Sequence, residues 1–254
     1  MPMRIKYKTI HMLLKPILIA TFFIYGATAC QSQTHQTSQQ TAAKNNDMQT
    51  TKNSIDDKFE KLDIAELQAK GSKSEGGVAK ADGNMVAATS YDLTTTGDDG
   101  AIITISGNNV NGYTKKETSP DSYFEVNKEY YPDGNIKSKG LKFINGGFNK
   151  GTWYFFDEKG TLTKSTNFDA PYKFTLENVM QFLQSEHIPL AKGPAKPDQG
   201  MVTTIWRNEG AQGPIWKIQW LKDKTKMPNT VEEIVLDGNT GKVTKRVDQK
   251  YNNS

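Results

Sequence analysis

The residue in this chain best placed to do covalent chemistry is a single cysteine. Cys30 is the only cysteine among 254 residues, and the small residues Ala27, Thr28 and Ala29 precede it. Four basic residues and the apolar stretch "ILIATFFIYG" come earlier, and this stretch is too short to span a bilayer. The sequence therefore predicts an export signal. A lone exported cysteine has no disulfide partner, which leaves two alternatives: a buried free thiol or a thiol that is covalently modified.

The segment that ends at Cys30 resembles the lipobox of bacterial lipoproteins, because an apolar stretch, small residues and a cysteine follow in that order. In that family the signal peptide is cut before the cysteine, and the thiol carries a diacylglyceryl group. The resemblance implies a signal peptide over 1–29, cleavage between Ala29 and Cys30, and a lipid bilayer as a partner through Cys30. Ala27 departs from the family, which more often has Leu there.

Two further details of this region concern the cellular location of the protein and the start of its chain. Gln31 stands where lipoproteins retained in the inner membrane typically have Asp, so the resemblance implies the periplasmic face of an outer membrane, if the organism has one. Met1, Met3 and Met12 are alternative starts, because the segment from Met12 is already a complete signal.

The other reactive residue types form no recognisable catalytic or metal-binding pattern. Two histidines follow the signal, His35 in a polar stretch and His187 at the end of an expected helix, and they cannot supply the ligand set of a zinc site. The acidic "GDDG" at 97–100 is more typical of a solvated turn than of a calcium site. Glu232 and Glu233 are expected to point to opposite faces of one strand, so they cannot share a substrate. The sequence predicts a protein that is not an enzyme and uses no metal and no cofactor.

The net charge of the chain belongs to its export signal. The full sequence has 32 basic and 28 acidic residues, and the first 29 residues hold four of the basic ones and none of the acidic ones. The remainder has 28 of each and is formally neutral. Nucleic-acid-binding domains carry a basic patch or stripe, so the balanced charge does not support a nucleic-acid partner.

The segment after the signal is expected to be a flexible tether. Residues 30–53 are mostly Gln, Thr, Ser, Asn and Ala, and they cannot bury enough apolar surface to offset the entropy lost on ordering. A short helix and a linker are expected over 54–84. Ser54 is the candidate N-cap, Gly71 is the candidate stop, and Gly, Lys and Ser become frequent from residue 70 onward.

A short motif occurs twice in the middle of the chain, as "YYPDGNI" at 130–136 and "FFDEKGTL" at 155–162. Each copy runs an aromatic pair into a polar turn with a glycine that can take a positive φ, which is typical of a β-hairpin. A lone hairpin is marginal in water, so copies are expected to lie side by side. With the strand signals that begin at Met85, this predicts a sheet of antiparallel hairpins over 85–169.

The segment from 129 to 168 resembles the MORN-like repeats of the YwqK antitoxin family. The likeness rests on "YYPDGNIKSKG", "NGGFNKGTWYFF" and "DEKGTLTKS", which follow the family's order of aromatic pair, turn ending in Gly, aliphatic residue, "NG…G", and Trp with further aromatics. It covers under two full repeats. The resemblance implies stacked hairpins and a protein that binds a toxin.

Residues 170–254 are expected to form a second module with one helix and an antiparallel sheet. "FTLENVMQFLQSEHIP" has apolar residues at helical spacing, with Thr175 as candidate N-cap and Pro189 beyond the end. "MVTTIW" and "PIWKIQWL" are typical of strands, and "VEEIVLDGNTGKVTKRV" of a hairpin that turns at "DGNTG". This order resembles a PepSY-like module over roughly 174–247. The predicted fold class is mainly β, of the α+β type: antiparallel repeat hairpins, then a small helix-plus-antiparallel-sheet module.

Aromatic side chains on β-structure are the feature best suited to binding. The candidates for partner contact are Tyr130, Tyr131, Trp153, Tyr154, Phe155 and Phe156. Because side chains alternate along a strand, Tyr131 is expected on the other face of the sheet from Tyr130. Trp153 and Phe155 are likewise expected on the other face from Tyr154 and Phe156. The sequence leaves open which of the two faces is the core.

Two functions remain open. The YwqK resemblance implies an immunity or antitoxin protein whose partner is a toxin or effector arriving in the periplasm. The PepSY-like resemblance implies a regulatory or structural envelope protein that modulates a protease or surface assembly. We expect the first.

Overall fold

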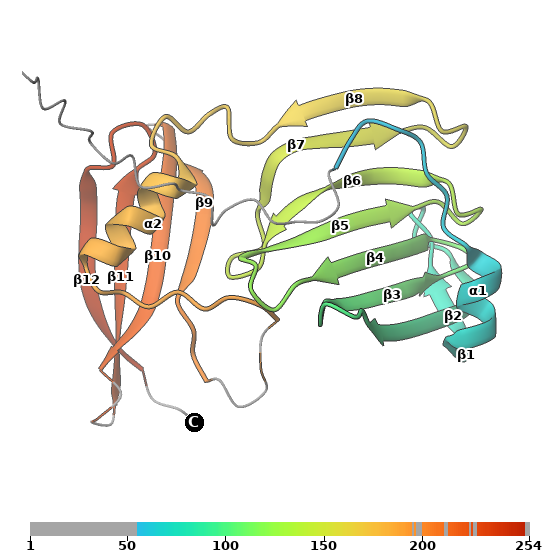
Figure 1. The fold of residues 1–254 in the computed structure, drawn as a ribbon, viewed down its shortest axis with the longest axis horizontal. Helices are drawn as coiled ribbons and strands as arrows, with labels where there is room; N and C mark the ends of the chain where they lie inside the picture. The colour runs from blue at the N-terminus through green and yellow to red at the C-terminus, as the bar shows by residue number, and fades with distance from the viewer. Residues whose placement is uncertain are drawn as a thin grey trace, which may run out of the picture. The chain divides into compact units, whose positions relative to one another are not determined.

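The computed structural model describes residues 55–251, except 195, 197–199, 211–212, 224 and 226–227 (Figure 1). The expected signal, lipidation site Cys30, tether and N-cap Ser54 lie outside the described residues. The described part confirms the predicted fold class: it is mainly β and antiparallel, with two helices and two sheets. Within that part, no helix is both long enough and apolar enough to cross a membrane.

Eight strands follow one another in chain order in the first sheet (Figure 1). They are β1 (Ser72–Ala79), β2 (Met85–Thr96), β3 (Ile102–Asn108), β4 (Gly112–Thr118), β5 (Phe124–Tyr130), β6 (Ile136–Phe143), β7 (Asn149–Phe156) and β8 (Leu162–Asn167). The two repeat copies thus form adjacent hairpins of one antiparallel sheet, as predicted. The expectation of a linker up to residue 84 was wrong, because β1 pairs with β2 without interruption from Ser72 to Ala79. A main-chain ladder of this kind does not need apolar side chains.

The turn of the repeated motif occurs at four hairpins of the described chain. In each, the first residue donates its N–H to the carbonyl of the fifth, and the fourth donates to the carbonyl of the first. The four turns are 80–84, 97–101, 131–135 and 157–161. Their fourth residues are Gly83, Gly100, Gly134 and Gly160, with φ of 85°, 77°, 87° and 81°, a region that side chains rarely adopt. The acidic stretch at 97–100 is therefore part of a turn, as expected.

The helix before β1 is shorter than predicted. α1 runs from Ile64 to Lys70, and its N-cap is Asp63, whose side chain accepts a hydrogen bond from the N–H of Glu66 at 2.9 Å. It ends at Gly71, as predicted. The residues before Asp63 are extended because they pair with the sheet instead: Leu62 donates its N–H to the carbonyl of Gly134.

The first core lies between one face of the sheet and the chain that leads into it. Its buried members are Leu62, Leu67, Tyr91, Tyr113, Tyr130, Ile136 and Phe156. Tyr130 and Phe156 come from the two repeat copies and are 3% and 4% exposed. The aromatic row that the repeats share on this face is thus interior.

Residues 55–62, here called the strap, cross the sheet and are held by a buried lysine (Figure 1). Lys139 on β6 is 3% exposed. Its Nζ donates to Asp56 Oδ1 at 3.2 Å, to the carbonyl of Lys58 at 2.6 Å and to Glu60 Oε1 at 2.9 Å. Burial acts to raise the pKa of Glu60, but hydrogen bonds from Lys128 and Lys139 outweigh it and hold that pKa below its ordinary value.

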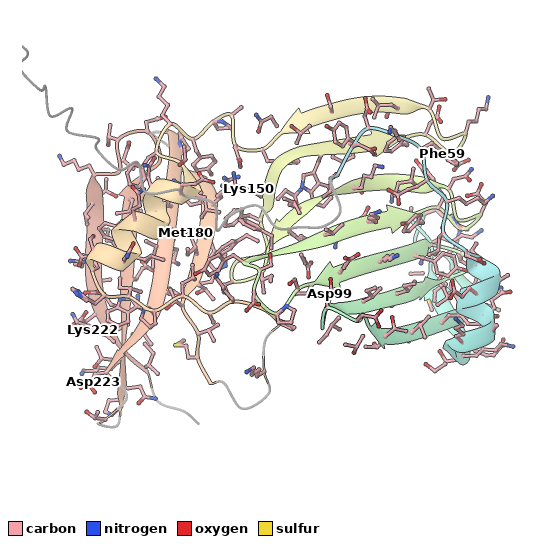
Figure 2. All side chains as sticks on the ribbon, in the orientation of Figure 1. Phe59, Asp99, Lys150, Met180, Lys222 and Asp223 are labelled. Atoms are coloured by element: carbon pink, nitrogen blue, oxygen red, sulfur yellow. The ribbon has the colours of Figure 1, made fainter. Side chains whose placement is uncertain are left out.

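The strap also rests on both repeat turns. A Cβ at Gly134 would lie 2.9 Å from the carbonyl oxygen of Leu62, and a Cβ at Gly160 would lie 2.3 Å from the ring of Phe59. Figure 2 labels Phe59. The turn glycines therefore serve a second purpose, since a larger residue would push the strap away.

The second sheet carries α2 (Leu176–Ser185) on one face. Its strands are β9 (Thr204–Gly210), β10 (Gly213–Asp223), β11 (Asn229–Asp237) and β12 (Val243–Tyr251), in the order β12-β11-β10-β9. Thr175 is the N-cap, as predicted, and forms a capping box with Asn178. Buried residues of α2, β9, β10 and β11 share a core with Phe124 and Phe143 of the first sheet, so the two sheets are joined through packed side chains.

We predict that Lys139→Met destabilises the protein by about 2 kcal/mol, because it leaves the strap carboxylates without their cation. The strap should then be cut faster by trypsin after Lys58 and Lys61. Urea unfolding and limited proteolysis of the full chain check this. The matched control is Lys137→Met, at an exposed position of the same strand. Equal proteolysis of the two variants would contradict a role for Lys139 in holding the strap.

Candidate binding site at the junction of the two sheets

Three of the six aromatic residues predicted to contact a partner are interior. Tyr130 and Phe156 belong to the first core. Trp153 is 4% exposed, and its Nε1 donates to the carbonyl of Leu141 at 2.9 Å. Its ring lies over Gly140, where a Cβ would come within 2.2 Å of the indole. These three side chains stabilise the sheet and are not available to a partner in this structure.

The other three aromatic residues are half-buried. Tyr154 packs against the first core, and Tyr131 donates its hydroxyl to the carbonyl of Phe156 at 2.9 Å. Phe155 lies 6.5 Å from Trp153, ring centre to ring centre. The expected alternation on β7 is confirmed, since Tyr154 and Phe156 face one core while Trp153 and Phe155 contact each other. Partner contact through the half-buried residues stays a prediction.

Glu232 and Glu233 point to opposite faces of β11, as predicted. Glu232 accepts a hydrogen bond from Trp220 Nε1 at 2.9 Å. Glu233 contacts Lys217 Nζ at 2.8 Å and Lys245 Nζ at 2.9 Å, and these hydrogen bonds lower its pKa to about 2. Among the described residues, no group of three or more His, Cys, Asp or Glu side chains is arranged to hold a metal ion.

The hairpin between β6 and β7 meets the edge of the second sheet. Ile205 on β9 donates its N–H to the carbonyl of Asn145 at 2.8 Å, and Asn145 Nδ2 donates to the carbonyl of Ala191 at 2.6 Å. A Cβ at Gly146 would lie 1.6 Å from the carbonyl oxygen of Ile205. Only glycine permits this approach, which places the hairpin directly against β9.

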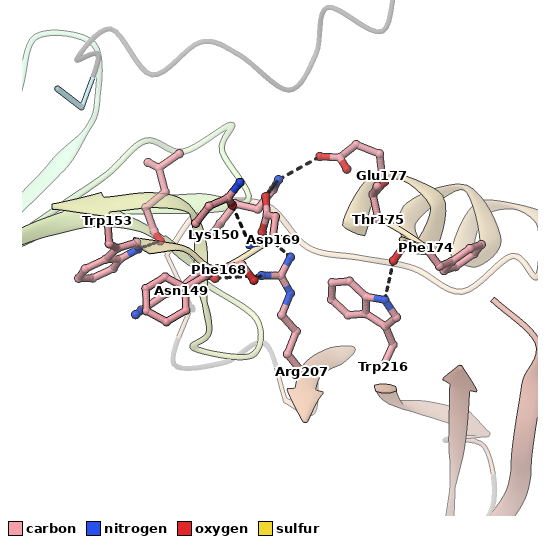
Figure 3. A network of polar contacts seen from close by, with 12 residues as sticks. Asn149, Lys150, Trp153, Phe168, Asp169, Phe174, Thr175, Glu177, Arg207 and Trp216 are labelled. Carbon is pink, nitrogen blue, oxygen red and sulfur yellow. Dashed lines mark hydrogen bonds and ion pairs between the residues drawn. The ribbon is translucent and has the colours of Figure 1, made fainter. Parts of the chain in front are cut away.

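Arg207 on β9 connects three segments at this junction (Figure 3). Its Nη1 donates to the carbonyls of Asn149 and Phe168, both at 3.1 Å. Its Nη2 donates to Asp169 Oδ1 at 2.6 Å. These acceptors lie at the start of β7 and just after β8, so one guanidinium ties the end of the first sheet to the second.

Aromatic rings surround the same guanidinium. Its carbon lies 4.6 Å from the ring centre of Phe148, 4.7 Å from that of Tyr172 and 4.8 Å from that of Trp216. The Arg207 side chain is only 7% exposed. A planar cation is attracted to the faces of aromatic rings, and the attraction is stronger when water is excluded. The rings and the cation therefore fix one another.

A second ion pair extends the network towards α2 (Figure 3). Lys150 contacts Asp169 and lies 3.4 Å from Glu177 Oε1 in the first turn of the helix. Burial acts to raise the pKa of Asp169, but hydrogen bonds from Lys150 and Arg207 outweigh it and hold that pKa below its ordinary value. Asp169 is therefore ionised at neutral pH and receives both cations.

A cavity of about 530 Å³ opens beside this network. Its apolar walls are Phe148, Phe168, Pro171 and Tyr172, and its polar lining is Gly147, Asn149, Thr166, Asn167 and Arg207. Two side-chain atoms of lining residues, Thr166 Oγ1 and Arg207 Nε, are buried and have no hydrogen-bond partner among the described residues. A buried polar atom without a partner costs free energy, so an occupant or water that reaches either atom would gain from bonding it.

The arrangement is suited to binding. Both terminal nitrogens of Arg207 already donate to protein acceptors, so its charge holds the walls of the cavity in place. Phe148 stacks on Phe143 at 4.9 Å and meets Trp216 edge to face at 5.7 Å, which fixes its orientation. Rigid aromatic walls can accept an apolar group with little loss of their own side-chain entropy.

Sequence reasoning missed this site, although one signal for it was present. Only three of the 32 basic residues are arginines, and Arg207 directly follows the expected strand "MVTTIW", which ends at Trp206. Arginine is preferred over lysine where a cation must stack on aromatic rings and bond carboxylates and carbonyls together. An arginine at the end of an expected strand, in a chain whose other basic residues are almost all lysines, was therefore a usable sign of a buried cation.

The comparisons with known proteins identify no relative. No protein-family model, no curated protein and no solved structure matches the chain. The resemblances to YwqK repeats and to PepSY-like modules therefore stay predictions.

We predict that Asp169→Asn lowers the free energy of unfolding by about 2 kcal/mol at pH 7, because it removes a charged acceptor from two cations. The pKa of Asp169 is lowered on folding, so its contribution is complete above the ordinary value of 3.8 and is lost as the pH falls through the lower folded value. The difference between wild type and variant should thus shrink below pH 3.8. Unfolding curves from pH 7 to pH 2 check this, with Asp57→Asn on the exposed strap as control. A difference that is independent of pH would contradict the ion pairs.

Proposed function

We propose that the protein is a lipid-anchored binding protein of the bacterial envelope, and that it holds a protein partner by accepting an apolar side chain of that partner in the junction cavity. The observation that carries this proposal is the preformed cavity, whose aromatic walls are fixed by Arg207.

The chemistry of the cavity supports a protein as the partner. A few large side chains that enter well-packed pockets supply most of the affinity of protein complexes. A volume of about 530 Å³ accepts one large aromatic or aliphatic side chain together with its neighbours. The polar groups at Asn149 and Asn167 supply hydrogen bonds at the rim.

The anchor and the class of partner rest on the sequence. The lipobox-like segment ending at Cys30 supports attachment to a membrane, with the outer membrane favoured by Gln31. The resemblance to YwqK repeats favours a toxin as the partner, which makes immunity the preferred function. The packing of α2 on a four-stranded antiparallel sheet supports the alternative, a PepSY-like regulator of an envelope protease or of surface assembly.

A photo-crosslinking amino acid at Asn167, which lines the cavity, tests the proposal in cells. The matched control position is Ser165, two residues earlier on β8 and also exposed. We expect a covalent adduct with one protein from position 167 and none from position 165. An exported toxin as the adduct supports immunity, and an envelope protease or assembly factor supports the alternative.

Filling the cavity should prevent the same binding. We predict that Pro171→Trp weakens binding of the identified partner by about 2 kcal/mol or more and leaves the melting temperature unchanged, because Pro171 is an exposed wall residue. Ala170→Trp, next to it and outside the lining, is the control. Equal adducts from positions 165 and 167, or unchanged binding by Pro171→Trp, would contradict the proposal.

A further inference from the structure

β1 is the terminal strand of the eight-stranded sheet, and no other strand of the described residues pairs with its outer edge. Seven of its eight residues are exposed, and the eighth, Val78, is half-buried. We propose that this edge pairs antiparallel with β1 of a second copy of the chain, so that the two first sheets join across a two-fold axis. The proposal does not depend on the function proposed for the junction cavity.

The direction of the main-chain groups of β1 follows from its neighbours. Thr89 on β2 directs its carbonyl and its N–H towards Asn109, on the β3 side. Hydrogen bonding alternates along an antiparallel strand, so the even-numbered residues of β2 bond to β1. The residues paired with them on β1, such as Ser74 opposite Ser90, are even-numbered too. The odd-numbered residues Lys73, Glu75 and Gly77 therefore direct their N–H and C=O groups outwards.

The edges formed by β8 and β12 are less suited to pairing. β8 is a shorter strand of six residues, and its ladder has a register shift between Phe155 and Phe156. β12 also has a shift in its ladder and carries Lys245, Arg246 and Lys250. Short strands, bulges and positive charges protect an edge from pairing. The ladder of β1 has an unbroken register and none of these bulges.

The charges of Lys73 and Glu75 favour one register for the pairing of the two β1 strands. A two-fold axis through Ser74 places Lys73 opposite Glu75 of the second copy, and Glu75 opposite its Lys73. An axis through Lys73 or Glu75 would place like charges directly opposite each other, which is unfavourable. Lys73 and Glu75 already share a face, because their charged atoms lie 2.7 Å apart, and both are more than half exposed.

Hydrogen bonds within the chain limit how far the two β1 strands can pair. The outward carbonyl of Ala79 accepts a hydrogen bond from Asn111 Nδ2 at 3.1 Å, and the N–H of Gly71 donates to the carbonyl of Leu67 at 2.8 Å. Pairing therefore spans the residues between them. Each pair of Lys73 with Glu75 exchanges two main-chain hydrogen bonds, so the central part supplies about four.

A disulfide at the axis tests the proposal. In this register the two Ser74 residues form a non-hydrogen-bonded pair, whose Cα atoms lie about 4.5 Å apart, within the range of a disulfide. We predict that full-length Ser74→Cys forms a disulfide-linked dimer when membranes are oxidised. Ser90→Cys, on the same face one strand further in, is the matched control, and the wild-type chain measures any contribution from Cys30.

Charge exchange tests the register in the same cross-linking assay. Lys73→Glu or Glu75→Lys, added to Ser74→Cys, should lower the dimer yield about fivefold, because two like-charged pairs then face each other. The combined Lys73→Glu and Glu75→Lys change should restore it. Both residues are exposed, and equal melting temperatures confirm the fold. A dimer yield from Ser74→Cys no higher than from Ser90→Cys, or no recovery with the combined change, would overturn the proposal.

Discussion

The contact between Arg207 and the end of the first sheet is the interaction on which the candidate site depends. A guanidinium is planar and stays charged, so it can bond two carbonyls and a carboxylate in one plane while its faces meet aromatic rings. Phe148 and Tyr172 are both walls of the cavity and neighbours of this cation. A lysine ammonium group is not planar and cannot donate to three acceptors in one plane while stacking on aromatic rings. It would therefore not hold Phe148 and Tyr172 in their orientations.

The strap gives a second physical explanation for the glycines of the repeated motif. Each turn needs a glycine for its positive φ, and in the two repeat copies the strap passes close to that glycine. The lysine that holds the strap, Lys139, lies on β6, the strand that follows the first of these turns. The ion pairs of Asp56 and Glu60 with Lys139 hold the start of the strap on the sheet, and the main-chain hydrogen bond from Leu62 to Gly134 holds its end.

Local signals predicted the elements well, and contacts between distant residues explain what they missed. The hairpins, α2 with its Thr175 cap and the stop at Gly71 follow from turn chemistry and apolar spacing. The start of α1 was placed too early, because pairing of Leu62 with Gly134 keeps the strap extended. β1 was missed because exposed main-chain pairing leaves no apolar pattern. The junction cavity could not be predicted, since its residues come from separate segments.

The two sheets share a core, and we expect the bonds of Arg207 across the junction to be needed for them to unfold as one cooperative unit. Hydrogen exchange of the full chain across a urea series, read separately for β5–β6 and for β10–β11, tests it most directly. In the wild type, both pairs of strands should lose protection at the same urea concentration. In Arg207→Met, β10–β11 should lose protection at a lower concentration than β5–β6. If both pairs of strands still unfold together in this variant, the shared core alone couples the two sheets and the role given to Arg207 is wrong.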